Sequence, residues 1–267
     1  ATFLQNVNVS VAITAGKLGI GFTDNNVKIG STALDSLTTG TLNTAVGYAA
    51  LTATTTGQYN TAVGYAALEA NTTGQGGTGI GLYALKANTT GNDNTAVGYI
   101  SLDANTTGDK NTAVGSGALS ANTTADKNTA VGNGAMASCT TGADNVAVGA
   151  FALDAALTGD YNTAVGSYSM SGNTTGEGNT AIGYAALDSN TTASHNTAVG
   201  RDALGANTTG TYNTAVGAYA LDAASTANNN TAVGYAALTS NTTGENNIAL
   251  GYNTLSSNTT GGANIAI

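Results

Sequence analysis

The residues able to act as a nucleophile and its base are few in this 267-residue chain, which holds one cysteine, Cys139, and one histidine, His195. A Cys–His pair works only when the two side chains come within hydrogen-bond reach. More than three copies of the repeat described below separate these two residues, which would hold them apart along a rod. We therefore expect His195 to be a solvated corner residue, Cys139 to be a small buried or corner residue, and the chain not to be an enzyme.

Other kinds of catalytic or metal site are equally hard to build. No glycine-rich stretch leads into the basic residue of a phosphate-binding loop. No repeat gathers the carboxylates that a polysaccharide-degrading β-helix needs, and the aspartate pattern of calcium-binding β-rolls is missing. Asp109 and Asp126 recur at one place in successive repeats, so their facing carboxylates could hold an occasional Ca²⁺. Beyond such an ion we expect no cofactor.

Tyrosines are the side chains best suited to surface binding. All twelve fall at three places of the repeat, and the first candidates for a binding surface are Tyr48, Tyr65, Tyr83 and Tyr99. Aromatic ranks bind glycans or partner chains because a Tyr ring combines an apolar body with a polar tip. Plain packing of rings between neighbouring coils is the alternative, and the one we favour.

The element that positions all these residues is a 17-residue unit, typified by residues 60–76, NTAVGYAALEANTTGQG. Fourteen complete copies fill residues 26–263 without insertion or deletion, and a fifteenth contributes four residues. Position 1 is the leading Asn, which one copy replaces by Gly. The copies begin at Asn26, Asn43, Asn60, Gly77, Asn94, Asn111, Asn128, Asn145, Asn162, Asn179, Asn196, Asn213, Asn230, Asn247 and Asn264.

Several positions of the unit are constant. Position 4 is aliphatic, position 5 is Gly, position 9 is Leu or Met, and position 14 is Thr in every complete copy. Two apolar ranks with small fillers and two turn signals predict coils that stack on one another, with positions 4 and 9 inside. We expect vertical ladders, including one of Asn amides. In two successive copies the ladder residues are Asn43, Val46, Gly47, Leu51, Thr56, Asn60, Val63, Gly64, Leu68 and Thr73.

The fold class follows from the unit. NTAV is typical of a short strand that Gly ends, and TTG is typical of a corner. The middle, such as residues 65–70, would suit one helical turn but is too short to hold a helix alone. We predict an all-β solenoid, or β-roll, built of 17-residue coils. Fourteen such coils would form a rod about 65–70 Å long. A short helical turn in each coil is the alternative for the middle segment.

Residues 1–25 do not follow the repeat and contain an alternating apolar stretch, Val7, Val9, Val11 and Ile13. We expect two regions: a capping or docking segment over residues 1–25 and a repeat solenoid over 26–267. The first would cover the first coil or dock on another molecule to build a head-to-tail filament. Each thin coil has few aliphatic side chains to bury against the entropy of ordering its residues, which favours a homo-oligomer.

Charge and hydropathy exclude other partners. The net charge is −9 with six scattered basic residues, so no basic stripe for nucleic acid or an anionic membrane surface can form. No apolar run approaches the roughly 20 residues of a membrane-spanning helix. Disorder is disfavoured because the aliphatic residues keep strict register.

Asparagine at position 12 creates NTT sequons, which are glycosylated only in a secretory pathway that reads them. The alternative is that they are ordinary turn residues beside threonine. The sequons begin at Asn71, Asn88, Asn105, Asn122, Asn173, Asn190, Asn207, Asn241 and Asn258.

The NTAVGYAAL…NTTG unit of residues 26–267 resembles repeats of phage and bacterial tail-fibre proteins. Its NTAVG core is similar to the NSVAIG-type strand of trimeric autotransporter adhesin heads. The resemblance implies three interlocked β-rolls that stand off a surface and bind a receptor. This unit is longer than that of the adhesin heads, and Thr replaces the first inward aliphatic residue of the core strand.

The sequence thus predicts a structural fibre or filament protein, located outside the cell, at a cell surface or on a virion. It would associate with itself and present a repetitive surface to a glycan or protein receptor, as a tail fibre, adhesin shaft or homopolymeric appendage. The alternative is an ice- or crystal-binding solenoid, suggested by the threonine ranks at positions 2, 13 and 14. A flat ice-binding face needs two ranks on one side of a strand, which adjacent positions 13 and 14 would not supply.

Overall fold

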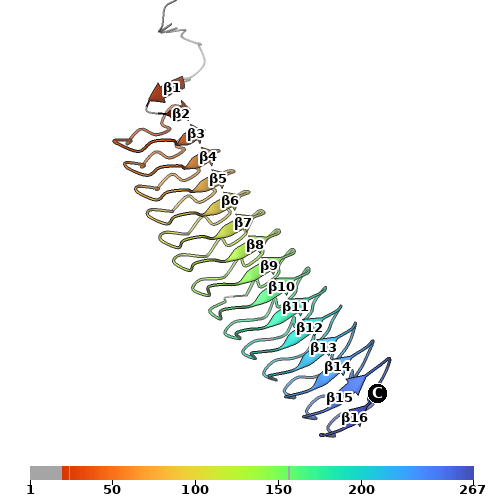
Figure 1. Ribbon diagram of the computed structural model, residues 1–267. Coiled ribbons are helices and arrows are strands. Elements are labelled where there is room, and N and C mark those ends of the chain that lie inside the picture. Colours follow the sequence, from red (N-terminus) through yellow and green to blue (C-terminus); the bar gives the residue numbers. More distant parts are fainter. Residues whose placement is uncertain (1–19, 24, 156) are drawn as a thin grey trace, which may run out of the picture.

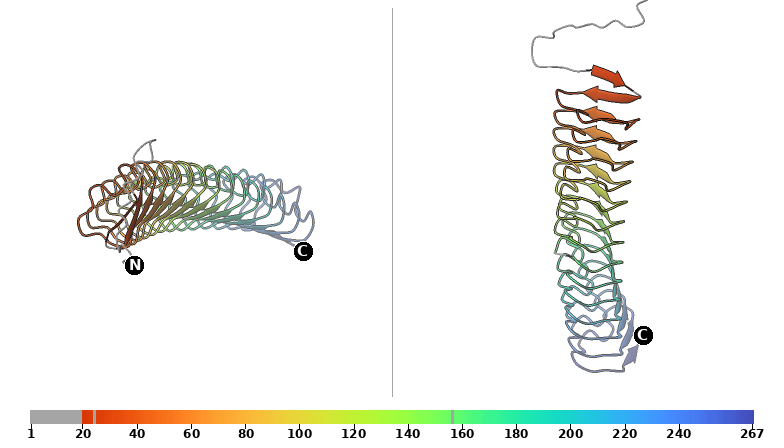
Figure 2. Two further views of the ribbon diagram at one scale, coloured as in Figure 1. Left: turned by 90° about the horizontal axis from the view of Figure 1, so that it is seen from above. Right: turned by 90° about the vertical axis from the view of Figure 1, so that its left-hand side faces the viewer.

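The computed structural model describes residues 20–23, 25–155 and 157–267, which form an elongated stack of coils (Figure 1). Each repeat makes one coil that contains one short strand, and we name a coil by its strand. The strands gather on one side of the stack and the connecting loops on the other (Figure 2). The described residues contain no helix, and hence none that could cross a membrane.

Strands of two to four residues make up a single sheet of sixteen, arranged in chain order. They are β1 Ile20–Thr23, β2 Asn26–Ile29, β3 Thr44–Val46, β4 Thr61–Val63, β5 Thr78–Ile80, β6 Thr95–Val97, β7 Thr112–Val114, β8 Thr129–Val131, β9 Val146–Val148, β10 Thr163–Val165, β11 Thr180–Ile182, β12 Thr197–Val199, β13 Thr214–Val216, β14 Thr231–Val233, β15 Ile248–Leu250 and β16 Ile265–Ala266.

Every coil lies in register on the next. From β2 to β16 the strands are parallel, and each residue pairs with its counterpart 17 residues later, as Ala164 does with Ala181. The predicted β-solenoid of 17-residue coils is confirmed. At the amino-terminal end, β1 pairs antiparallel with β2, Ile20 opposite Ile29. The alternating stretch from Val7 to Ile13 lies outside the described residues.

The core differs from the prediction at position 4. In the coils of β3 to β14, alanine at position 3 and Leu or Met at position 9 are fully buried, for example Ala147 and Leu153. Position 4 was expected inside, but Val46 and Val63 are only partly buried and Val148 is 37% exposed. Successive side chains of a strand point to opposite faces. Because the strand turns its alanine inward, positions 2 and 4 both face outward.

The helical turn considered for the middle of the unit does not form. Positions 7 and 9 have positive φ, as at Ala66 (φ 53°) and Leu68 (φ 52°). A left-handed residue costs about 1–2 kcal/mol for a side chain with a Cβ. Burying a leucine returns about 1.5–3 kcal/mol, which offsets that strain. The left-handed residues at positions 7 and 9 direct the position-9 side chain into the core. A helical turn would instead carry the backbone forward along the helix axis.

Glycine at position 5 is required by the stacking itself. Gly115 has φ 138°, and a Cβ built on it would lie 2.3 Å from the carbonyl oxygen of Gly132 in the next coil. No side chain fits between two backbones that approach so closely. Gly117, two residues further on, has φ 67° but nothing within 4 Å of such a Cβ.

We predict that Gly115→Ala lowers stability by about 2–5 kcal/mol, because strain at positive φ adds to overpacking against the next coil. Gly117→Asn is the matched control and should change stability by less than about 1 kcal/mol, since Asn tolerates left-handed φ and Asn253 already occupies this position with φ 55°. Thermal and denaturant unfolding followed by circular dichroism measures both. Equal stability of the two variants would contradict the close-approach argument.

Candidate binding surfaces of the rod

The asparagines at position 1 tie each coil to its neighbour from inside. The Asn111 backbone N–H donates to Oδ1 of Asn94 at 2.9 Å, and its Nδ2 donates to the Ala125 carbonyl at 2.8 Å. The same pattern joins Asn43 to Asn26 and Asn60 to Asn43. These side chains are buried, so the ladder gives the backbone polar groups of each corner hydrogen-bond partners without water.

A second asparagine ladder runs along position 12. Nδ2 of Asn88 donates to Oδ1 of Asn71 at 3.0 Å and to the Gly91 carbonyl at 2.9 Å. Both asparagines are fully buried, so the sequon nitrogen that would carry a glycan is enclosed in the core. Attachment of a glycan at these sites therefore requires the coil to be open. At Asn258, near the carboxyl end, the same side chain is only partly buried.

Sequence reasoning missed that this ladder is broken at two points. Oδ1 of Asn122 and Oδ1 of Asn207 are buried and have no hydrogen-bond partner. In each case the next coil lacks the asparagine that would donate, because Cys139 and Ala224 stand at position 12. A buried acceptor without a donor destabilises by about 1–3 kcal/mol.

We predict that Ala224→Asn raises stability by about 0.5–1.5 kcal/mol, because its amide would donate to Asn207 and accept from Asn241. The site accommodates the larger residue elsewhere: Asn190 sits in a coil that, like this one, has alanine at position 15. Ala224→Leu, which adds volume without a donor, is the control and should be destabilising. The melting temperature measures both, and a lower value for Ala224→Asn than for the wild type would refute the ladder argument.

The outer face of the sheet, formed by positions 2 and 4, is a continuous uncharged strip. We call it the sheet face. It carries Thr or an aliphatic residue at position 2 and Val, Ile or Leu at position 4 in every copy. Ile80 is 40% and Val148 is 37% exposed. Within the described coils, no hydrogen bond joins a position-2 threonine hydroxyl to the protein, so these hydroxyls face outward unpaired.

The other threonine ranks lie at the corner of the coil. At position 13 the hydroxyl is used within the stack, as when Thr106 donates to the Thr123 carbonyl at 3.0 Å. At position 14, Thr56 and Thr73 are exposed, and each N–H points to the position-13 carbonyl of the following coil. The position-14 rank is thus a surface-exposed turn rather than part of a flat strand face.

An aromatic rank follows the sheet face along the rod at positions 6 and 7. It contains one side chain from each of seven consecutive coils, six aromatic residues and one arginine, and each contacts the next. Neighbouring ring centroids lie 5.5–6.1 Å apart, and the arginine guanidinium lies 5.7 and 5.8 Å from the two rings beside it. The aromatic rank consists of Phe151, Tyr168, Tyr184, Arg201, Tyr219, Tyr235 and Tyr252.

Three of the four tyrosines singled out in the sequence form a shorter rank of the same kind. Tyr48 stacks on Tyr65 at 5.2 Å, and Tyr65 meets Tyr83 edge to face at 5.5 Å. The ammonium of Lys86 lies 4.6 Å from the Tyr83 ring. Tyr99 is half exposed and takes part in no ring contact with a described residue. Packing between coils therefore accounts for the first three, while each still presents an edge to solvent.

Cys139 and His195 lie three coils apart, a stacking distance of about 14 Å. Cys139 is buried and its Sγ is 3.5 Å from the Gly142 carbonyl oxygen. Burial, together with the smaller effect of the nearby Asp160, raises the pKa of the Cys139 thiol to about 11. His195 stacks on the Tyr212 ring at 5.3 Å. Neither residue is arranged to activate the other.

Asp109 and Asp126 meet through one hydrogen bond in which the Asp109 backbone N–H donates to Oδ1 of Asp126 at 2.7 Å. Asp109 in turn accepts from the Asn92 N–H. In residues 20–23, 25–155 and 157–267 no three His, Cys, Asp or Glu residues form a group that could hold a metal ion. Carboxylates at position 16 thus serve as caps for the coil before them.

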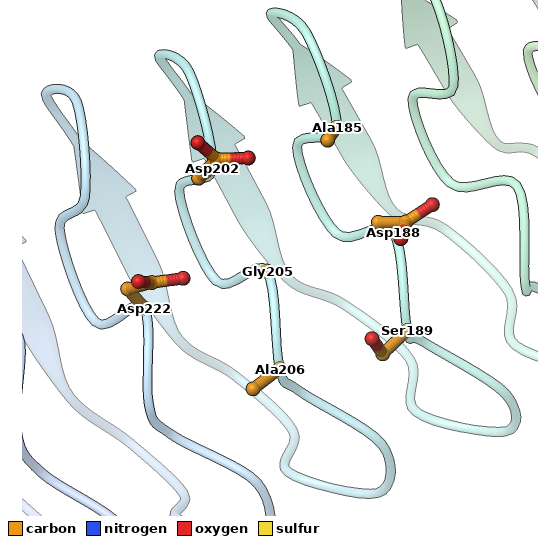
Figure 3. Close-up of a pocket in the computed structure, with 7 residues that line it drawn as sticks. All are labelled: Ala185, Asp188, Ser189, Asp202, Gly205, Ala206 and Asp222. Carbon is orange, nitrogen blue, oxygen red and sulfur yellow. The ribbon is translucent and has the colours of Figure 1, made fainter.

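A shallow, open pocket of about 270 Å³ lies along positions 7, 10 and 11 of the coils of β11, β12 and β13 (Figure 3). Asp188, Asp202 and Asp222 line it from three successive coils, and Gly205 lies between them. The Asp222 side chain points towards the coil of Gly205. Burial, and then the nearby Asp202, raises the pKa of the Asp222 carboxyl. Asp103 and Asp154 at the same position of their coils also have raised pKa values, mainly through burial.

We predict that mild acidification stabilises the rod. A carboxyl whose pKa is higher in the folded than in the unfolded chain binds its proton more tightly when folded. The ionised carboxylate therefore lowers the free energy of unfolding at neutral pH, and this loss of stability disappears as the pH falls through the folded-state pKa. The melting temperature should rise as the pH is lowered from neutral towards the range in which these carboxyls bind protons, and Asp222→Asn should raise it at neutral pH. Asp93→Asn, at an exposed corner, is the control and should have little effect.

Comparisons with known proteins provide no family for this chain. No protein-family model matches it, and a search of curated proteins finds no match.

Proposed function

We propose that this protein is a structural fibre component, without catalytic activity, whose copies associate side by side through the sheet face. The observation that carries the proposal is the strip itself. It runs from β2 to β16 with no charged side chain at positions 2 and 4, in a chain of net charge −9. An exposed, uncharged strip of this length, with an unbroken row of aliphatic side chains at position 4, is typical of an interaction surface.

The size of the sheet face fits a stable interface. The fifteen strands from β2 to β16 are separated by fourteen spacings of about 4.8 Å, which gives a strip about 67 Å long. Two ranks of side chains, about 7 Å apart along the strand, make it on the order of 12 Å wide with their outer surfaces. The area is therefore about 800 Å², which is the amount each partner buries in a typical specific complex. Long parallel rods can align along this whole length because every coil presents the same profile.

A second copy is the partner that best complements this surface. The position-4 side chains form one regular row, so the row of a second rod can interlock with it at the same spacing. The resemblance to tail-fibre repeats and to trimeric adhesin heads supports three copies per fibre and a location outside the cell, at a cell surface or on a virion. The surface left outside such a fibre would be available to a glycan or protein receptor.

We predict that the wild-type protein sediments as a homo-oligomer and that Val148→Lys shifts it towards monomer, because the ammonium would be buried against an apolar row. Thr141→Lys adds the same charge at an exposed position-14 corner and is the matched control, which should leave the oligomer intact. Analytical ultracentrifugation of the full chain gives the masses. A monomeric wild type, or equal behaviour of the two variants, would rule out association through the sheet face.

Ice or crystal binding is the second candidate, because positions 2 and 4 place two ranks on one side of each strand. The unpaired position-2 hydroxyls could order water in a regular array. The sequence alone had not indicated that positions 2 and 4 share the outer face. A thermal-hysteresis assay on the wild type and on Thr129→Lys separates the two functions. Activity of a monomeric wild type that is lost in the variant would support ice binding and contradict the fibre.

A further inference from the structure

The chain contains two versions of one arrangement at position 10, which lies beside the aromatic ranks. In the first version Lys86 stands between two acidic residues, Glu69 in the coil before and Asp103 in the coil after. In the second version Gly205 stands between Asp188 and Asp222. The stacking is in register, so the three residues of each set are direct neighbours along the rod. The two sets differ mainly in that the middle residue of the second has no side chain.

The first version shows what occupies the middle place. The Lys86 ammonium lies 3.8 Å from a Glu69 carboxylate oxygen and 4.6 Å from the centroid of the Tyr83 ring. Its charge also lowers the pKa of Asp103, against the larger effect of burial. One cation thus pairs with an acidic neighbour and lies over an aromatic ring, an arrangement that stabilises ammonium and guanidinium groups.

The second version leaves the middle place open, and the pocket of about 270 Å³ is the result. No lysine or arginine of the described residues forms an ion pair with Asp188 or Asp222. Asp188 accepts a hydrogen bond from the Ser171 hydroxyl, and Asp202 is paired with Arg201 at 3.0 Å. The pocket therefore has an excess of negative charge, part of it on the carboxyl of Asp222, which is partly withdrawn from solvent.

The aromatic rank runs along the neighbouring positions 6 and 7 but contributes no ring to the lining of the pocket. Arg201 lies between the rings of Tyr184 and Tyr219, with its guanidinium 5.8 and 5.7 Å from their centroids. Tyr219 is the position-7 residue of the flanking coil that carries Asp222. The middle coil, that of Gly205, has Asp202 at the position that Tyr83 occupies in the coil of Lys86. The outer pairs of rings stack nearly parallel, at 17° and 13°, so their faces cover one another and offer little to a sugar ring.

We propose that this pocket, which we call the Gly205 pocket, binds a lysine or arginine side chain of a partner protein. The partner's cation would take the place that Lys86 fills in the first version, paired with the carboxylates of Asp188 and Asp222 beside the aromatic rank. The inference is independent of the sheet face, because positions 7 and 10 lie beyond the strand.

The test uses the full chain and a blocked peptide, acetyl-Gly-Lys-Gly-amide, with norleucine in place of lysine as the neutral probe. Nuclear magnetic resonance titration follows the Gly205 amide. The lysine peptide should shift this signal saturably and the norleucine peptide should not. Gly205→Lys supplies the chain's own cation, so it should weaken binding at least tenfold and raise the melting temperature. A Cβ at this position would lie 2.9 Å from Oδ1 of Asp222, a side chain that can rotate away, and 3.3 Å from the Asp202 carbonyl oxygen.

Ser256→Lys adds the same charge at the same position of another coil, beside Thr239, and should bind the peptide as the wild type does. Lys86→Gly should open a second pocket and raise the number of peptides bound from one to two. Unchanged binding by Gly205→Lys, or equal loss in Ser256→Lys, would overturn the proposal by showing general attraction to an acidic rod. Binding of a neutral chitin oligosaccharide that survives Asp222→Asn would assign the surface to glycans instead.

Discussion

The structure depends on coils that repeat in perfect register, so that each residue has its own counterpart as its neighbour one strand spacing away. This constraint makes glycine obligatory at position 5, where the Gly115 and Gly132 backbones approach too closely for any side chain. It also makes asparagine favourable at positions 1 and 12, because its side-chain oxygen accepts a hydrogen bond from the next copy of itself. The donor is the backbone N–H at position 1 and the side-chain amide at position 12. A thin coil that buries only Ala and Leu is thus completed by polar ladders inside the core.

The period and the strand could be predicted because they are properties of the repeat that recur in every copy, and stacking copies must place like on like. The inward face of the strand could not. A strand of three residues is too short for its alternation to identify the buried side. In β9, for example, the sequence allows either Ala147 or its neighbours Val146 and Val148 to face inward. Burial of alanine follows from the narrow interior, which leucine at position 9 fills from the opposite wall. Positive φ at leucine was equally invisible, since the same letters suit a helical turn.

The candidate surfaces were predictable in part. Tyrosines confined to positions 6, 7 and 17 had to form ranks once stacking was assumed, and Tyr48 and Tyr65 do so. Which rings stack face to face depends on whether neighbouring coils carry their aromatic residue at the same position or at positions 6 and 7. Only the side-chain geometry of the folded rod shows this difference. The sequons at position 12 gave no sign of being buried, because NTT reads as an exposed turn. Only the inward course of the backbone at that corner places Asn88 in the core.

Constant positions therefore build the rod, while variable positions can change singly without disturbing it. Replacing one side chain at position 10 leaves the ladder hydrogen bonds intact, because they run through the backbone and through positions 1 and 12. The same substitution alters the surface at a defined place, since the neighbours above and below stay fixed. Lys86 and Gly205 illustrate both outcomes on one chain: a cation that pairs with one of two flanking acids, and an opening between two others. In such a rod a binding site can thus arise by removing one side chain rather than by assembling several.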